Sequence, residues 1–222
     1  VALSMNRIYP FKRSSRIGKR WYDQVGLGAN LRASNSVITP DTSLFEPTTI
    51  KNMRNGATVS VPISTTFTIL KYIHVTPSIN TNGYLYLKTY REHYDKDSNK
   101  IYRDTLNEVK FLADASASAT MNTMVYGDYY FKTKHLKQIH QTITPTIGFS
   151  YKPDYGLPQY GYYGQYEDSL KKNVIYPYFK NGIFGGPSAG KSETVNFGLS
   201  TTFEAKIKKN SDSGEVFKKV KL

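Results

Sequence analysis

Hydrophobic and polar residues alternate along most of the chain with a period of two, the pattern of β-strands with two unlike faces. In 57–69, odd positions such as Val59 and Val61 are apolar, whereas the even positions are mostly Ser and Thr. The same alternation recurs along the chain, and no segment shows the 3.6-residue stripe of a helix. It predicts an all-β chain with strands near 20–34, 57–69, 72–87, 109–126, 138–151, 193–209 and 216–222.

The connections between these strands alternate in length. Long segments, 35–56, 88–108 and 152–192, follow the first, third and fifth strands, and short turns follow the others. The strands exceed the ~5–6 residues typical of globular sheets and match the ~9–11 needed to cross a bilayer obliquely. Long loops on one rim and short turns on the other are typical of outer-membrane barrels. The sequence therefore predicts a segment of an antiparallel transmembrane β-barrel.

The alternation also assigns the two faces of each strand. We expect odd positions to face lipid and even positions to face a hydrated lumen, because barrel strands alternate in this way. The most clearly lipid-facing positions predicted are Val59, Val61, Ile63, Phe67, Phe197, Leu199 and Phe203. Seven strands are fewer than the roughly 8 of the smallest barrels. We therefore expect the chain to be part of a larger barrel in the cell outer membrane.

Composition agrees with a barrel and argues against an enzyme. The mean hydropathy is only -0.50, as expected when lipid meets every second residue. The chain has 19 Tyr and 11 Phe, which suit the aromatic girdles of barrels, and no Cys that could form a disulfide or a thiolate metal site. The His residues lack metal-ligand spacing, and no Ser, His and carboxylate grouping predicts a nucleophile. We expect no catalytic residue, metal or cofactor.

Positive charge gathers on the side of the short turns. Four pieces there (1–20, Lys71, 127–137 and 206–221) together carry +13, equal to the net charge of the whole chain. One interpretation is a solvated rim whose long side chains reach toward lipid phosphates. The other is a contact surface for anionic lipids or lipopolysaccharide. Its candidate residues are Lys134, Lys137, Lys208 and Lys209. No nucleic-acid fold signature accompanies this charge.

Residues 185–192, GGPSAGKS, match the pattern of a phosphate-binding loop. Such a loop must open a helix whose N-terminus helps to cradle phosphate. Here the next residues, 193–207, alternate as a strand. We therefore interpret Gly185, Gly190, Lys191 and Ser192 as part of a loop that returns into a strand, not as a nucleotide site.

Four longer phrases together resemble one family. They are WYDQVGL (21–27), RNGATVSVPISTTFTILKYIHVTPSIN (54–80), IHQTITPTIGFSYKPDYG (139–156) and IFGGPSAGKSETVNFGLSTTFEAKIK (183–208). The chain is similar to the Bacteroidota-type LptD family of outer-membrane lipopolysaccharide-assembly proteins.

The resemblance implies a non-catalytic barrel of about two dozen strands that inserts lipopolysaccharide into the outer leaflet of the outer membrane. It implies as partners lipopolysaccharide, an outer-membrane lipoprotein plug, periplasmic bridge proteins and membrane lipids. Two alternatives stay open. One is another outer-membrane barrel, a porin or nutrient transporter, and the other is a soluble β-sandwich binding module.

Overall fold

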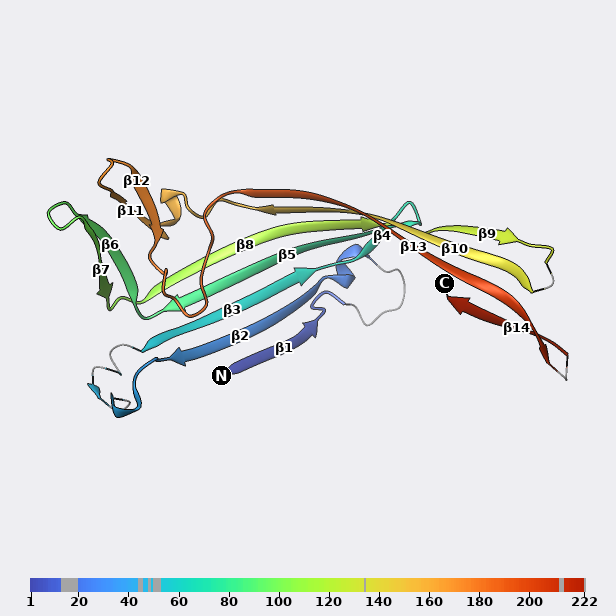
Figure 1. Ribbon diagram of the computed structural model, residues 1–222, viewed down its shortest axis with the longest axis horizontal. Coiled ribbons are helices and arrows are strands. Elements are labelled where there is room, and N and C mark those ends of the chain that lie inside the picture. Colours follow the sequence, from blue (N-terminus) through green and yellow to red (C-terminus); the bar gives the residue numbers. More distant parts are fainter. Residues whose placement is uncertain are drawn as a thin grey trace.

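A single antiparallel sheet forms the body of the protein in the computed structural model (Figure 1). The structure describes residues 1–12, 20–43, 46, 47, 49, 53–133, 135–211 and 214–221, with backbone only for 208–211, 214–219 and 221. The strands follow one another across the sheet in chain order. They are β1 (Ala2–Ile8), β2 (Gly26–Ser36), β3 (Arg54–Ser64), β5 (Ile73–Tyr86), β8 (Lys110–Asn122), β10 (Leu136–Lys152), β13 (Ser192–Ser211) and β14 (Gly214–Lys221). The predicted all-β antiparallel fold is confirmed.

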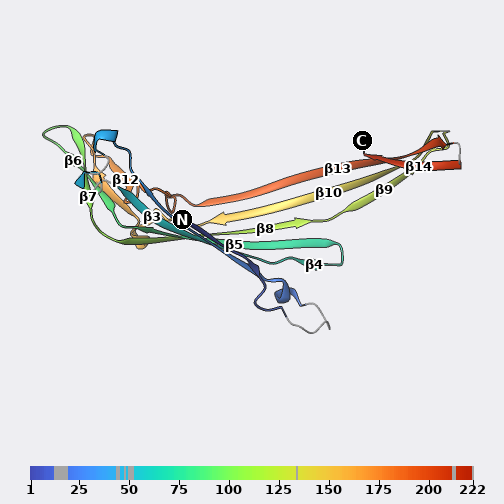
Figure 2. The ribbon, with the colours of Figure 1, turned by 90° about the horizontal axis from the view of Figure 1, so that it is seen from below.

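Two short strands extend this path. β4 (Phe67–Ile69) pairs with β5, and β9 (Val125–Tyr130) pairs with β10. The sheet twists strongly and curves along its length, as the second view shows (Figure 2). Its shape is that of a half-barrel, one wall of a larger barrel.

The strand β1 was not among the sequence predictions. Its register against β2 shifts between Met5 and Ile8. After Leu3 and Met5, the next apolar residue, Ile8, therefore falls at an even position, and the regular alternation of the other strands is lost. A smaller difference concerns the predicted strand 20–34, where Trp21–Gln24 form a 3-10 helix (η1) and the strand starts at Gly26.

The three long connections lie at one end of the sheet, the long-loop end, and the short turns at the other, the short-turn end (Figure 1). Two of the long connections contain hairpins of their own. They are β6 (Thr89–Asp95) with β7 (Lys100–Leu106), and β11 (Tyr163–Glu167) with β12 (Asn173–Pro177). Two further 3-10 helices, η2 (Asp41–Ser43) and η3 (Pro158–Tyr160), also lie in these connections.

The hydrophobic core is small and lies under the long loops. Tyr86 and Leu112 from the sheet are buried against Phe179 from the 152–192 connection. Elsewhere the sheet is a single layer, so most of its large apolar side chains stay exposed. Such a layer cannot be stabilised by a core of its own and needs another apolar phase on its hydrophobic side.

None of the helices in the part of the chain that the structure describes is long and apolar enough to span a membrane.

Candidate functional site

The register of the sheet keeps residues of equal parity together from β2 to β13. Leu27 lies opposite Ile63, Ile63 opposite Ile79, and Ile79 opposite Ala117. Successive side chains of a strand point to opposite faces. The odd-numbered residues of these strands therefore share one face and the even-numbered residues share the other, except at the start of β10, where the register shifts between Leu136 and Gln138.

The odd-numbered face, which we call the apolar face, exposes large hydrophobic side chains. Phe197 and Leu199 on β13 are 78% and 73% exposed, and Phe203 is 37% exposed. Val59, Val61, Ile63 and Phe67 lie on the same face and are partly exposed. Leu31, Ile79, Leu85, Phe111, Met121, Ile147, Phe149 and Val195 extend the exposed surface across the sheet. A continuous apolar surface of this kind is a contact surface for lipid or for another protein.

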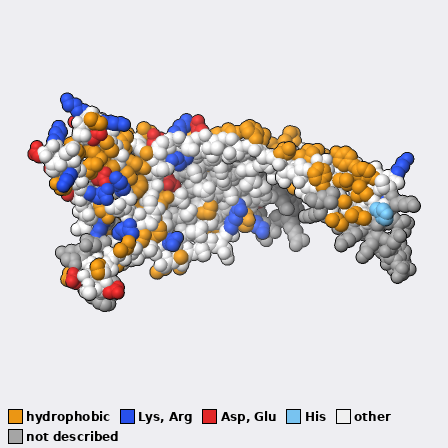
Figure 3. Space-filling view, in the orientation of Figure 1, with side chains coloured by type: hydrophobic (Ala, Val, Ile, Leu, Met, Phe, Trp, Pro, Cys, Tyr) orange, Lys and Arg blue, Asp and Glu red, His pale blue; other side chains and the backbone are white. Residues whose placement is uncertain are grey.

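The even-numbered face, which we call the polar face, carries small hydroxyl and amide side chains. One row crosses five strands, from Ser64 through Ser78, Ser118 and Ser150 to Thr194. The Ser78 and Ser118 hydroxyls are 2.7 Å apart and share a hydrogen bond. The view onto this side shows few hydrophobic side chains over β3, β5 and β8 (Figure 3). We call the row from Ser64 to Thr194 the hydroxyl row.

A carboxylate, Asp114, stands on the polar face two polar positions along β8 from Ser118 of the hydroxyl row. Asn82 Nδ2 donates to Asp114 Oδ1 at 2.8 Å, and the Tyr84 hydroxyl donates to Asp114 Oδ2 at 3.2 Å. Both donors come from β5, directly across the ladder or one residue pair away. The negative charge is thereby fixed in place by neighbouring side chains, since buried or half-buried charges need such partners. The period-two pattern marked Asp114 only as a polar position.

Tyrosines of the 152–192 connection cover a free strand edge at the long-loop end. The last pair between β8 and β10 is Ala117 with Tyr151, so β8 continues without β10 beyond that point. The Tyr155 hydroxyl accepts from the Ala115 N–H at 2.5 Å and donates to the Ala115 carbonyl at 2.9 Å.

The Tyr162 hydroxyl repeats this double contact at Ala113, at 3.0 and 3.1 Å. Each hydroxyl thus replaces the two hydrogen bonds of a missing strand neighbour. An unpaired edge is a liability that proteins cover in some way.

A buried carboxylate joins the two loop hairpins to each other. The Glu92 side chain on β6 is 3% exposed and accepts from Arg103 at 2.6 Å and from Lys180 at 3.2 Å. The Tyr90 N–H donates to the Tyr178 carbonyl at 2.9 Å, beside this cluster. Burial alone would raise the pKa of the Glu92 carboxyl, but the hydrogen bonds from Arg103 and Lys180 outweigh it and lower that pKa. We call the joined hairpins the loop cap.

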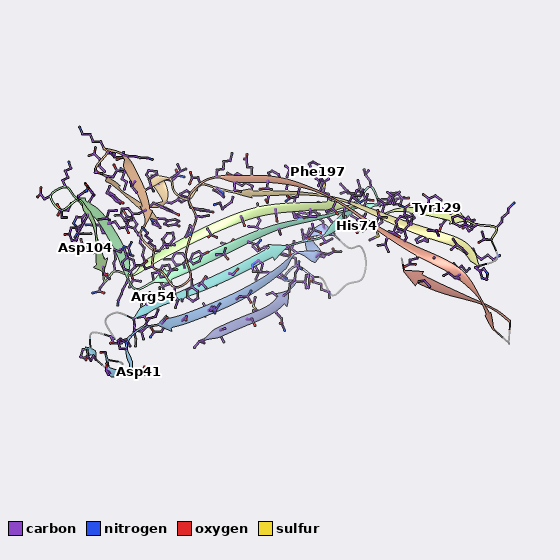
Figure 4. The ribbon with its side chains drawn as sticks, viewed as in Figure 1. Asp41, Arg54, His74, Asp104, Tyr129 and Phe197 are labelled. Carbon is purple, nitrogen blue, oxygen red and sulfur yellow. The ribbon has the colours of Figure 1, made fainter. Side chains whose placement is uncertain are left out.

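A second polar cluster lies at the short-turn end, where β9 and β10 pair. Asp128 Oδ1 accepts from Gln138 Nε2 and from His140 Nδ1, both at 2.8 Å. A pocket of about 350 Å³ adjoins it, lined by Gln138, His140, Glu204, Ala205 and Lys206. Across the described residues, no group of three or more His, Asp or Glu is arranged to hold a metal ion. In Figure 4, Tyr129 lies at the short-turn end of the sheet, and Asp41, Arg54 and Asp104 lie at the long-loop end.

The structure places the four predicted lysine contacts only in part. Lys137 lies near the start of β10 and is half-buried. Lys208 and Lys209 belong to β13, but their side chains lie outside the described residues, as does Lys134 altogether. Contacts of these lysines with anionic lipid stay a prediction.

The phosphate-loop match at 185–192 leads into a strand. Gly185 and Gly190 adopt positive φ, and Ser192 is the first residue of β13. The Gly190 N–H, which would face a phosphate in a nucleotide site, donates to Asp154 Oδ1 at 2.7 Å. Lys191 Nζ lies 2.7 Å from Glu193 Oε1. The Gly190 N–H and the Lys191 ammonium are thus engaged by side chains of the same chain, and the helix that a phosphate loop needs is replaced by a strand.

Comparison with known protein families gives a match over the whole length of the chain. A family model described as "LptD protein" matches residues 1–222. No curated protein and no solved structure matches the chain.

Proposed function

Because this chain belongs to the LptD protein family, whose family model covers residues 1–222, we propose that it is a wall of the outer-membrane barrel that inserts lipopolysaccharide into the outer leaflet. Membership of the family gives the broader role in lipopolysaccharide transport and assembly. The finer statement, a translocating barrel wall, is supported by one observation above all. It is the single-layered sheet with a continuous apolar face on one side and a continuous polar face on the other.

The two faces fit the two halves of the cargo. Lipopolysaccharide joins acyl chains to a phosphorylated saccharide, so its movement needs an apolar phase beside a hydrated one. In our proposal the apolar face, with Phe197 and Leu199, meets the membrane lipids, and the hydroxyl row lines the lumen. Exposed apolar surface is then satisfied by lipid, and exposed hydroxyls by water.

The lengths of the connections also indicate how the barrel would be oriented in the membrane. Long loops of outer-membrane barrels face the outside and short turns face the periplasm. The loop cap, built on Glu92, would therefore close over the lumen at the cell surface. The basic short-turn end would face the periplasm, where Lys134, Lys137, Lys208 and Lys209 could meet anionic lipid or cargo arriving from periplasmic bridge proteins. A lipoprotein plug would fill the remaining lumen.

The proposed role is transport without catalysis. The polar face offers hydroxyls, amides and the paired Asp114 as a hydrated surface, and its side chains guide and orient without forming or breaking bonds.

Depletion of the full-length protein in its own cells tests the proposal. We expect lipopolysaccharide to disappear from the cell surface, measured with an antibody on intact cells, while total lipopolysaccharide stays constant. A matched pair of variants links the effect to this chain. Ser118→Phe should reduce surface lipopolysaccharide because it narrows the hydrated side, whereas Ala119→Phe adds the same ring on the apolar face beside Pro77 and Phe149 and should be tolerated.

Normal surface lipopolysaccharide after depletion, together with loss of uptake of a small nutrient, would assign the barrel to a porin or nutrient transporter instead.

A further inference from the structure

The sheet extends past the β4–β5 hairpin at the short-turn end. β9 pairs with β10 from Val125 opposite Ile143 to Tyr130 opposite Gln138. β13 continues alongside β10 through this whole stretch. Figure 1 shows β9 with the adjoining parts of β10 and β13 running beyond β4. We call β9 together with 136–143 and 201–207 the extension.

The polar face of the extension differs in composition from the rest of that face. Its side chains form a grid of three rows across β9, β10 and β13. The rows are Tyr126, Thr142 and Thr202; then Asp128, His140 and Glu204; then Tyr130, Gln138 and Lys206. Elsewhere this face carries mainly Ser, Thr and Asn, and its tyrosines Tyr84 and Tyr86 pack in or against the core beneath the loop cap. The extension thus joins aromatic rings to planar polar groups on an open surface.

Two tyrosine side chains are exposed on this surface. Tyr126 is 60% exposed and Tyr130 is 77% exposed. The Tyr126 ring stacks on the His140 ring, with centroids 5.7 Å apart and an interplanar angle of 22°. His140 in turn is held by Asp128, which also receives the Gln138 amide. The tyrosine and its polar neighbours are therefore already ordered, which lowers the entropy lost when a ligand binds.

The charges of the grid do not favour a simple anion. Asp128 and Glu204 are acidic, Lys206 is basic, and His140 donates to Asp128. A phosphate would meet two carboxylates on this surface. A ligand rich in hydroxyls would instead find both acceptors and donors, since carboxylates accept and the Gln138 amide both donates and accepts. Exposed tyrosine rings offer flat apolar faces with a polar edge.

We propose that the polar face of the extension binds saccharide, with Tyr126 and Tyr130 as stacking platforms and Asp128, Gln138 and Glu204 as hydroxyl partners. The adjoining pocket of about 350 Å³ has room for a sugar ring. This inference rests on the proposed function, because it assigns the saccharide part of the cargo to this surface at the periplasmic end. The same chemistry would recognise a glycan of the cell wall.

Binding measurements on the purified full-length protein in detergent test the proposal. The probes are fluorescently labelled core oligosaccharide, released from lipopolysaccharide without its acyl chains, and a labelled disaccharide-peptide fragment of peptidoglycan. The double variant Tyr126→Ala/Tyr130→Ala should weaken oligosaccharide binding by about tenfold or more, as loss of buried tyrosine contacts does elsewhere. Tyr126→Trp in place of alanine should restore the contribution of that position.

Tyr129→Ala is the matched control. Tyr129 lies on the same strand and is 52% exposed, but it belongs to the apolar face and donates to Gln141. Its loss should leave oligosaccharide binding unchanged. A urea midpoint equal to that of the unmodified protein shows that each variant is folded.

The outcomes separate this inference from the proposed function. Unchanged oligosaccharide affinity in the folded double variant overturns the saccharide surface, even if depletion abolishes surface lipopolysaccharide. Weakened affinity with normal surface lipopolysaccharide after depletion supports the surface and overturns the proposed transport role. Binding of the peptidoglycan fragment alone overturns the link to cargo and assigns the surface to the cell wall.

Discussion

Leu199 offers the sharpest test of which face meets lipid. Its side chain is 73% exposed on the apolar face of β13 and lies opposite Pro145. A barrel strand advances about 3.3 Å per residue at a tilt of about 40°, or about 2.5 Å along the membrane normal. Leu199 is then ~10 Å from Val195 and ~15 Å from Ala205, near the middle of an apolar band ~25 Å tall.

Arginine at this depth costs about 2–4 kcal/mol. Because each 1.4 kcal/mol is a factor of ten, Leu199→Arg should lower the equilibrium for membrane insertion by roughly 30- to 700-fold. Ser200→Arg is the matched control, since Ser200 is the next residue of β13, faces the polar side and lies opposite Thr144. It places the same charge at the same depth in water, so we expect little effect.

The measurement is urea unfolding of the full-length protein refolded into phospholipid vesicles, followed by its heat-dependent mobility on gels. The urea midpoint should fall for Leu199→Arg and stay close to the unmodified value for Ser200→Arg. Equal midpoints for all three proteins, or a larger loss for Ser200→Arg, would show that the assignment of faces is wrong.

Four further predictions concern the long-loop end. Glu92→Gln should loosen the loop cap by about 1–3 kcal/mol, less than the ~3–5 of a fully buried pair because its cationic partners are partly exposed, and should speed proteolysis within 88–108. Folding lowers the pKa of Glu92, so the stability that its carboxylate contributes is complete at pH values above the ordinary pKa of 4.5 and is lost as the pH falls through the lower pKa of the folded state. Acid should therefore speed the same cleavage in the unmodified protein. Tyr155→Phe with Tyr162→Phe should leave two backbone N–H groups of β8 without partners, at about 1–3 kcal/mol each, and should raise amide hydrogen exchange there; protection equal to that of the unmodified protein would contradict the edge-covering role. Lys191→Ala should leave surface lipopolysaccharide unchanged, because the Lys191 side chain is exposed and pairs only with Glu193 of the same segment among the ion pairs described. A loss of transport would support the interpretation of 185–192 as a nucleotide site.

The period-two pattern predicted most of the sheet, because the strands from β2 to β13 have one apolar and one polar face. Most residues of the 57–69 segment indicate their face by their polarity, Pro62 and Thr65 excepted, so strand, register and face follow together. The split of this segment at Thr65 and Thr66, between β3 and β4, left no mark in the alternation. The alternation did not predict β1, because the bulge between Met5 and Ile8 moves the apolar residues of this strand from odd to even positions.

The loop cap could not be predicted from the pattern. The strands of its hairpins lie outside the main sheet and belong to neither of its two faces, and their polar and tyrosine-rich sequences indicate a loop. Glu92 is buried only because Arg103 and Lys180, 11 and 88 residues away, reach it in the folded chain. The tyrosine hydroxyls that cover β8 act through geometry that residue types alone do not reveal. The tyrosine-rich run YGLPQYGYYGQY at 155–166 carries both hydroxyls, but residue types alone do not indicate which strand edge they cover.

The hydroxyl row has a kinetic consequence. A serine hydroxyl both donates and accepts and turns freely about its bond, so each site can exchange one partner for water without leaving a group unpaired. Dwell time at a surface is set mainly by dissociation, and small, interchangeable contacts keep dissociation fast. The hydroxyl row runs from Ser64 to Thr194 and contains no charged side chain, so a large amphiphile would dissociate from it quickly and move along it. In our proposal Tyr126 and Tyr130 of the extension bind the same molecule more tightly.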